Sequence, residues 1–184
     1  MTLFIFYLIF IVEILSLLFV LTNLGNQTSS VWPPQERNTK TIYSLMIIFY
    51  SIVVGNIWLS IKEWDNLFLN VPGLRFVGAF FFIVGVAIYA WCRMYMSKKI
   101  EFGGKDHLIT QGPYKYTRNP LYIADTLIFL GFALFSNSML VIILMTLLVF
   151  TLLLLPLIEE SWLLEQYGEK YRRYKAKVPR YIKI

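Results

Sequence analysis

The chain has 184 residues, of which 58% are hydrophobic and 15% charged, and its net charge is +6. The single cysteine, Cys92, excludes an internal disulfide and a cysteine metal cluster. The apolar residues are gathered into blocks, each near the length of about 20 residues with which a helix crosses a bilayer. This composition indicates a membrane protein rather than an ordinary soluble domain.

Five apolar blocks follow one another along the chain, at residues 3–21, 42–61, 76–92, 121–135 and 139–158. The first contains Glu13 and the fourth contains Asp125, while the other three carry no charge. The first block lacks the basic start and the cleavage site of a signal peptide, so we expect it to be retained. We therefore predict an all-α polytopic membrane protein with about five transmembrane helices.

Basic residues are distributed unevenly between the segments that join these blocks. With five spans, the segments 23–40 and 98–119 and the tail 159–184 share one side, which carries fourteen Lys and Arg residues. The other side carries only Lys62 and Arg75. The positive-inside rule then places the C-terminus in the cytoplasm and the N-terminus on the opposite side. The basic surface fits topology and anionic lipid headgroups rather than nucleic acid.

The fourth and fifth blocks are joined by only residues 136–138 and should form a tight helical hairpin. Arg118 and Pro156 are each 19 residues from Asn137, so they should lie at similar depth. Arg118 and its neighbour Asn119 are therefore predicted to lie level with Glu159 and Glu160, at the open end of the hairpin.

The tail beyond the hairpin is predicted to be helical and cytoplasmic, with a break at Gly168. Its Lys, Arg and Tyr residues suit a position on the membrane surface or folded over the hairpin mouth. We divide the chain into a three-span region, 1–97, and a region 98–184 that holds a loop, the hairpin and the C-terminal segment, within one membrane domain.

Charged and aromatic residues gather at the predicted mouth of the hairpin. Pro120 begins a helix, and a helix N-terminus with Arg118 beside it is a ready site for an anion. Glu159 and Glu160 stand across from it, so the mouth suits a ligand with an anionic end, a cationic end and an aromatic ring. The alternative is structural: Arg118 pairs with one of the glutamates and pins the hairpin.

Ionisable residues inside the spans are costly and usually face a cavity or a partner. Asp125 lies about one and a half turns beyond Asn119 and is predicted to line the same cavity, with a hydrogen bond to a neighbour as the alternative. Glu13 snorkels, pairs with Arg93 or faces a partner helix. The only histidine, His107, has no obvious orienting partner, which favours binding over catalysis. No metal site is predicted, because one His and one Cys cannot supply it.

The loop and the hairpin mouth resemble the isoprenylcysteine carboxyl methyltransferase family. The resemblance is carried by residues 107–114 (HLITQGPY), 118–122 (RNPLY) and the pair Glu159-Glu160 with Leu163. It continues through the tail at 167–174 (YGEKYRRY) and Val178-Pro179-Arg180, and covers roughly residues 98–184.

The resemblance implies an integral membrane methyltransferase that uses S-adenosylmethionine on the cytoplasmic side and takes a lipophilic substrate sideways from the bilayer. The implied cofactor-binding residues are His107, Leu108, Ile109, Gly112, Tyr114, Arg118, Asn119, Pro120, Tyr122, Glu159, Glu160 and Arg180. Arg118 and Glu160 are the implied catalytic pair. Arg118 would hold a carboxylate of cofactor or substrate, and Glu160 (or Glu159) the cofactor ammonium or sulfonium.

Two positions depart from the commoner family pattern. Asn119 stands where many members have His, and an amide cannot act as a basic or cationic imidazole. His107 lies one residue later than the histidine of many members. Either Asn119 serves binding rather than proton transfer, or the substrate differs. A prenylcysteine carboxylate is the favoured acceptor, and a phospholipid amine or a small hydrophobic thiol or acid are alternatives.

Two other functions are compatible with the sequence. Membrane sterol and steroid reductases, which use NADPH, carry a related Arg-x-Pro-x-Tyr-x-x-Asp/Glu segment that Asp125 would complete, although they are usually longer. The adjacent glutamates favour the methyltransferase. A non-enzymatic membrane scaffold would need Arg118 and Glu160 for stability alone.

Overall fold

The computed structural model describes residues 1–24, 39–97 and 106–182. Within these ranges the chain is helical and has no strand, which confirms the all-α prediction for that part. The helices are α1 (Thr2–Asn23), α2 (Thr39–Lys62), α3 (Leu74–Arg93), the 3₁₀ helix η1 (Gly112–Lys115), α5 (Pro120–Ser136), α6 (Met139–Tyr167) and α7 (Glu169–Lys177). Five of the basic residues used to predict topology lie outside the described residues: Arg37, Lys98, Lys99, Lys105 and Lys183.

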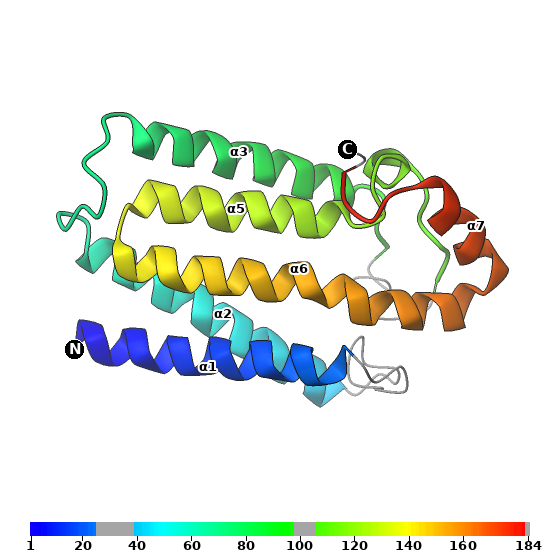
Figure 1. Cartoon of the computed structure of the whole chain (residues 1–184), viewed down its shortest axis with the longest axis horizontal. Helices are drawn as coiled ribbons and strands as arrows, with labels where there is room; N and C mark the ends of the chain where they lie inside the picture. Colours follow the sequence, from blue (N-terminus) through cyan, green and yellow to red (C-terminus); the bar gives the residue numbers. More distant parts are fainter. Residues whose placement is uncertain (25–38, 98–105, 183–184) are drawn as a thin grey trace.

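The long helices run side by side along the long axis of the molecule (Figure 1). α5 packs between α3 and α6, and α1 and α2 pack against α6 from the other side. α5 and α6 run in opposite directions and are joined by Asn137 and Ser138 alone. The N-terminus lies at the end of the bundle where this turn is found, whereas α7 lies at the opposite end.

Among the described residues, three helices are long and apolar enough to cross a membrane, namely α1, α3 and α6. α5 is apolar but has only 17 residues, a length of about 26 Å against a hydrocarbon core of about 30 Å. The apolar stretch Met46–Lys62 of α2 is equally short. The count of five spans therefore stays a prediction.

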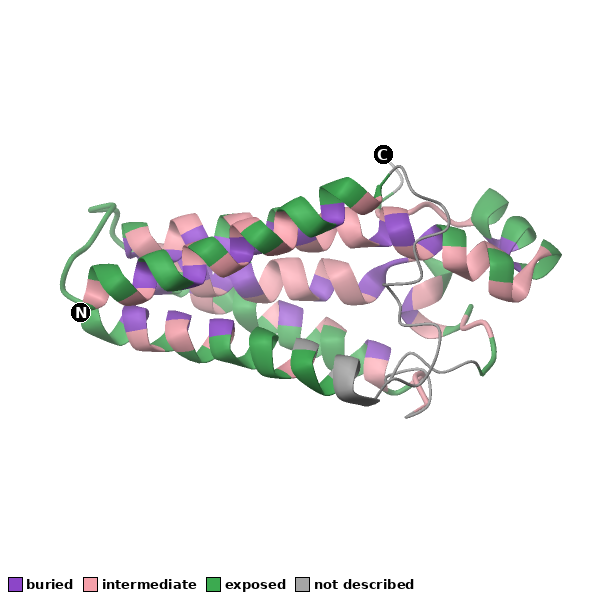
Figure 2. Ribbon diagram, turned by 90° about the horizontal axis from the view of Figure 1, so that it is seen from below, coloured by how far each residue is buried: buried purple, intermediate pink, exposed green. Residues whose placement is uncertain are grey.

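The outward faces of the long helices are apolar. Phe4, Leu8 and Leu15 are exposed along α1, and Phe76 and Ile83 along α3. Figure 2 shows such exposed residues along the outer sides of the helices, with buried residues on other faces of the same helices. A protein dissolved in water rarely exposes so extended an apolar surface. These faces suit contact with lipid, and the chain is an integral membrane protein.

Glycines hold α3 and α5 in close contact. A Cβ added at Gly131 would lie 2.8 Å from the Gly78 carbonyl oxygen on α3. A Cβ added at Gly85 would lie 2.8 Å from the Ile128 nitrogen and 2.9 Å from the Ala124 carbonyl oxygen on α5. Small residues let helix backbones approach this closely in membranes, where van der Waals packing replaces the hydrophobic effect between helices. The contact fixes the position of α5 relative to α3.

The turn between α5 and α6 is tied to the loop that precedes α3. Asn137 has a left-handed φ of 51°, which Asn tolerates better than most residues. Its side-chain amide donates to the Leu69 carbonyl at 2.8 Å, and its Oδ1 accepts from the Leu69 amide at 3.1 Å. The Phe68 amide donates to the Asn137 carbonyl at 2.9 Å. These bonds close the end of the bundle away from α7.

Glu13 lies buried inside the helical bundle. Its side chain is 1% exposed, and neither carboxylate oxygen has a hydrogen-bond partner among the described residues. The interpretations in which Glu13 snorkels or pairs with Arg93 are therefore wrong. The interpretation in which it faces another helix of the chain agrees with its burial, because α1 packs against both α2 and α6.

Replacing Gly131 with Ala should destabilise the protein by about 1–3 kcal/mol, the usual cost of overpacking. The added methyl group would meet the backbone of α3, which cannot move aside by a rotamer change. Thermal unfolding in detergent measures the effect. Gly55→Ala is the matched control, because a Cβ there would meet only the side chain of Ile9. Equal melting temperatures for the two variants would contradict the close contact of the backbones.

Candidate active site

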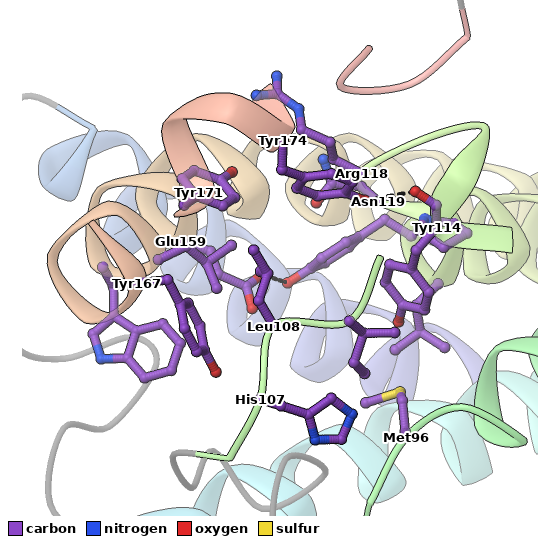
Figure 3. A pocket seen from close by; sticks show the side chains of 16 residues that line it. Met96, His107, Leu108, Tyr114, Arg118, Asn119, Glu159, Tyr167, Tyr171 and Tyr174 are labelled. Atoms are coloured by element: carbon purple, nitrogen blue, oxygen red, sulfur yellow. Dashed lines mark hydrogen bonds between the residues drawn. The ribbon is translucent and has the colours of Figure 1, made fainter. Parts of the chain in front are cut away.

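A pocket lies at the end of the bundle where α5 begins and α6 ends. The enclosed space that a water-sized molecule can enter is about 150 Å³, and the pocket opens to solvent. Its walls come from Met96 after α3, from residues 107–122, from the last turns of α6 and from α7. Figure 3 shows side chains from these segments converging on the cavity.

The structure brings nine of the twelve predicted binding residues together around this pocket. They are His107, Leu108, Ile109, Tyr114, Arg118, Asn119, Pro120, Tyr122 and Glu159. Gly112, Glu160 and Arg180 are not part of the lining.

Seven lining residues were not among those predictions. They are Met96, Leu121, Trp162, Leu163, Tyr167, Tyr171 and Tyr174. Trp162, Leu163 and Tyr167 follow Glu159 at the spacing of one helix face, so this set could have been found from the sequence. Tyr171 and Tyr174 are three residues apart on α7, which also places them on one face. Met96 carries no sequence signal that distinguishes it.

The level predicted for the two ends of the hairpin is confirmed by direct contacts. A guanidinium nitrogen of Arg118 lies 3.0 Å from a carboxylate oxygen of Glu160. The hydroxyl of Tyr122, in the first turn of α5, donates to Glu159 at 2.8 Å. Both contacts join the beginning of α5 to the same turn of α6.

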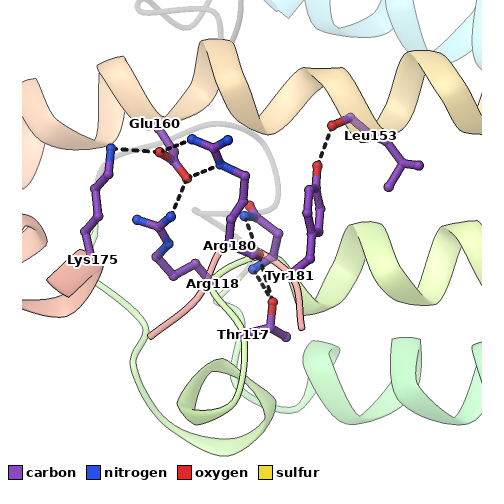
Figure 4. Close-up of polar contacts among 8 residues, drawn as sticks. Thr117, Arg118, Leu153, Glu160, Lys175, Arg180 and Tyr181 are labelled. Carbon is purple, nitrogen blue, oxygen red and sulfur yellow. Dashed lines mark hydrogen bonds and ion pairs between the residues drawn. The ribbon is translucent and has the colours of Figure 1, made fainter. Parts of the chain in front are cut away.

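Glu160 is the centre of a cluster of ion pairs beside the pocket (Figure 4). Arg180 donates to both of its carboxylate oxygens, at 2.8 and 2.9 Å. Lys175 on α7 lies 3.0 Å away, and Arg118 completes the set. Glu160 is 5% exposed, so its carboxylate is enclosed by three cations. The pairing alternative for Arg118 is thus observed, and it coexists with the position of Arg118 in the pocket wall.

The segment after α7 folds back over the beginning of α5. The Arg118 amide donates to the Pro179 carbonyl at 2.9 Å. The Arg180 carbonyl accepts from the Thr117 hydroxyl at 2.9 Å and from the Asn119 side-chain amide at 3.0 Å. The hydroxyl of Tyr181 donates to the Leu153 carbonyl on α6. We call residues 178–182 the C-terminal strap.

Two residues of the strap region have pKa values that follow from these contacts. The hydrogen bond to Glu160 raises the pKa of Arg180, which therefore stays charged. Burial raises the pKa of Tyr174 to about 12, so its hydroxyl is protonated at neutral pH. That hydroxyl donates to the Tyr114 carbonyl at 2.7 Å and ties α7 to η1.

Several polar groups in the pocket wall have no partner among the described residues. They are Nε and Nη1 of Arg118, Nε1 of Trp162 and the hydroxyl of Tyr171. Glu159 accepts from Tyr122 but has no ion pair with a described cation. Buried donors without acceptors are rare in folded proteins. Together with the acidic Glu159, they describe a pocket shaped for a polar ligand that carries charges of both signs.

Gly112 and His107 stand at the edges of this arrangement. Gly112 has a left-handed φ of 58°, and a Cβ there would collide with the ring of Tyr95. Glycine at this position is therefore explained by the fold, without a role in binding a ligand. His107 lines the pocket, but its side chain is 65% exposed and lies 3.4 Å from Asp106. Its position at the rim agrees with binding better than with general-base catalysis.

Asp125 does not line the pocket, so the prediction that it forms the deeper wall is wrong. The preceding residue, Ala124, packs on Gly85 of α3, which turns this stretch of α5 toward that helix. The prediction used depth along the helix, and depth does not determine the direction of a side chain.

These observations define an integral membrane protein of apolar helices with a pocket at one end of the bundle, lined by apolar and aromatic side chains together with Arg118 and Glu159. The chain belongs to the phospholipid methyltransferase family, whose model matches residues 74–170, more than half of the chain. This is the family of membrane methyltransferases like the isoprenylcysteine enzymes, so the resemblance is confirmed. The match begins with α3, which the resemblance at 98–184 did not include. Searches of curated proteins and of solved structures found no match.

Glu160→Gln should lower the stability of the protein, because it leaves three cations around a neutral amide. Breaking a buried ion pair costs about 3–5 kcal/mol. Lys175 and Arg180 are partly exposed, which screens them, so we expect about 2–3 kcal/mol. Thermal unfolding in detergent measures this loss.

Glu169→Gln is the control for this experiment. Glu169 pairs with Arg172 and Arg173 at 3.7 and 3.8 Å, but all three side chains are exposed. Such pairs contribute about 0–1 kcal/mol, so the melting temperature should hardly change. Equal effects of the two substitutions would show that the Glu160 cluster does not stabilise the fold.

Proposed function

We propose that this chain is an S-adenosylmethionine-dependent membrane methyltransferase that acts on a lipophilic substrate. The family supports methyl transfer at a membrane. The observation that carries the cofactor proposal is the presence, in one pocket, of a buried cation and a carboxylate: among the described residues, two donors of the cation have no acceptor and the carboxylate has no cationic partner. Arg118 supplies the cation and Glu159 the carboxylate. S-adenosylmethionine carries groups of matching charge: a carboxylate, an ammonium and a sulfonium.

The pocket residues fit this cofactor in charge and in surface. Arg118 would hold the carboxylate, and Glu159 would hold the ammonium or lie beside the sulfonium. The rings of Tyr114, Tyr122 and Trp162 offer aromatic surface for the adenine. This proposal gives Glu159 the contact first expected for Glu160, because Glu159 lines the pocket and Glu160 is enclosed by Arg118, Lys175 and Arg180.

The contribution of the chain to the reaction is position and the exclusion of water. When bound, S-adenosylmethionine supplies an electrophilic methyl group, which an acceptor displaces in line. Holding two reactants in alignment lowers the activation free energy, because their translational and rotational freedom is already lost on binding. In this proposal Arg118 binds, while Glu160 and Arg180 hold the Arg118 side chain and the strap in place from outside the pocket.

The acceptor we propose is a carboxylate on a lipophilic molecule such as a prenylcysteine, entering from the bilayer. A carboxylate is ionised at neutral pH and needs no general base. A phospholipid amine is the second candidate, which the description of the family favours. An amine must lose a proton before it attacks, and Glu159 is the carboxylate in the pocket that would accept one. Turnover of prenylcysteine and phosphatidylethanolamine in parallel assays separates the two acceptors.

Binding of S-adenosylmethionine to the purified protein in detergent is the first test of this function. We expect saturable binding that is lost in Arg118→Ala. NADPH, titrated in parallel, should not bind. Binding of NADPH alone would instead favour the reductase, and binding of neither ligand would favour a scaffold.

Glu159→Gln should weaken S-adenosylmethionine binding about tenfold or more, because it removes the carboxylate that lines the pocket. A charge-assisted hydrogen bond contributes about 1.5–3 kcal/mol, and 1.4 kcal/mol is tenfold. Glu165→Gln is the control, since Glu165 is exposed on the same helix and does not line the pocket. Equal affinities of these two variants for the cofactor would remove Glu159 from the site.

We further propose that the pocket end of the bundle is cytoplasmic and that five helices cross the membrane. Cys92, the only cysteine, is fully buried, so single cysteines can be introduced at exposed positions. An impermeant maleimide should label Asn70→Cys from outside intact cells. It should label Lys177→Cys only after the membrane is permeabilised. Labelling of both from one side would contradict the three crossings that the proposal places between these two residues.

A further inference from the structure

Tyr171 presents an unused hydroxyl to the pocket. Its side chain projects from α7 and is 1% exposed. Its hydroxyl is buried and has no hydrogen-bond partner among the described residues. Burial raises the pKa of Tyr171, so the group is a hydrogen-bond donor at neutral pH. A buried hydroxyl without an acceptor lowers stability, and a ligand in the pocket would supply one.

The neighbouring Tyr174 shows that the free hydroxyl is not general to α7. Both rings line the pocket and pack against each other, with centroids 6.2 Å apart. The Tyr174 hydroxyl is already donated to the Tyr114 carbonyl, which anchors the helix. Figure 3 shows the two rings side by side on α7, near Arg118. The helix therefore holds Tyr171 in place without using its polar group.

Arg118 offers further unused donors to the same end of the pocket. Its side chain is 8% exposed, and only Nη2 is paired, with Glu160. Nε and Nη1 are buried and have no partner among the described residues. Arg118 and Tyr171 line the same pocket, and the charges of Glu160, Arg118 and Glu159 all act on the Tyr171 hydroxyl.

Positive charges outnumber negative charges around these donors. Arg118, Lys175 and Arg180 surround the single carboxylate of Glu160. Even with the carboxylate of Glu159 counted, two negative charges face three positive ones, so this end of the pocket attracts a further anion. Arginine N–H groups with a hydroxyl beside them suit a carboxylate, which accepts several hydrogen bonds at once.

We propose that Tyr171 and the Nε and Nη1 groups of Arg118 form a subsite for the carboxylate of the cofactor. This inference rests on the proposed function and assigns the polar end of the bound molecule. It makes α7 part of the binding site, beyond residue 170, where the family match ends. Glu159 then remains to bind the ammonium group of the cofactor.

The test compares two ligands that differ only in this group: S-adenosylmethionine and decarboxylated S-adenosylmethionine. The native protein should bind the first more tightly. Tyr171→Phe keeps the buried ring, and should weaken binding of S-adenosylmethionine about tenfold while changing the affinity for the decarboxylated ligand less than about twofold. Isothermal titration in detergent measures both dissociation constants.

Two further variants keep the test decisive. Arg118→Lys retains a cation beside Glu160 but loses the paired donors, and should also reduce the affinity ratio of the two ligands. Tyr174→Phe removes a hydroxyl that is already used, and should leave that ratio unchanged. An equal loss for both ligands in Tyr171→Phe, or no loss, would overturn the subsite. If native protein binds neither ligand, the proposed function itself fails with it.

Discussion

Four segments of the chain meet at the carboxylate of Glu160. The beginning of α5 supplies Arg118, α7 supplies Lys175, the strap supplies Arg180, and α6 carries the glutamate itself. A buried ion cluster adds little net stability compared with apolar packing, because desolvation offsets the attraction. It does define geometry, since a buried charge without its partners is strongly unfavourable. The shape of the pocket wall thus depends on this carboxylate, although Glu160 does not line the pocket.

The two adjacent glutamates have separate roles because neighbouring residues on a helix point about 100° apart. Glu160 turns toward the strap and is enclosed by cations, whereas Glu159 turns toward the pocket and accepts from Tyr122. One glutamate holds the structure and the other stays available to a ligand. A single carboxylate could not serve both purposes, because three cations around it would leave it no charge to offer a bound ammonium. Glu160 therefore supports the structure, and Glu159 is available for binding.

The sequence predicted the parts of the site that follow from distance along helices. Equal spacing on both sides of Asn137 placed Arg118 level with Glu160, and the contact is present. The spacing alone could not predict which glutamate faces the pocket, because that depends on the rotation of α6 about its axis. The same limit misplaced Asp125. The contacts of the strap could not be predicted from the sequence either. Most of them join a backbone carbonyl to a distant residue, and a backbone carbonyl is the same in every residue type.

Asn119 shows how a departure from the family pattern can agree with the rest of the structure. The resemblance leads one to expect His at this position, and an imidazole there would offer a proton as well as a hydrogen bond. Here the side-chain amide donates to the Arg180 carbonyl and so helps to hold the strap whose guanidinium reaches Glu160. Asn119 therefore acts on the pocket through the strap and needs no titratable group. Methyl transfer to a carboxylate requires no base, so a site built on this amide is consistent with an acceptor that is already ionised.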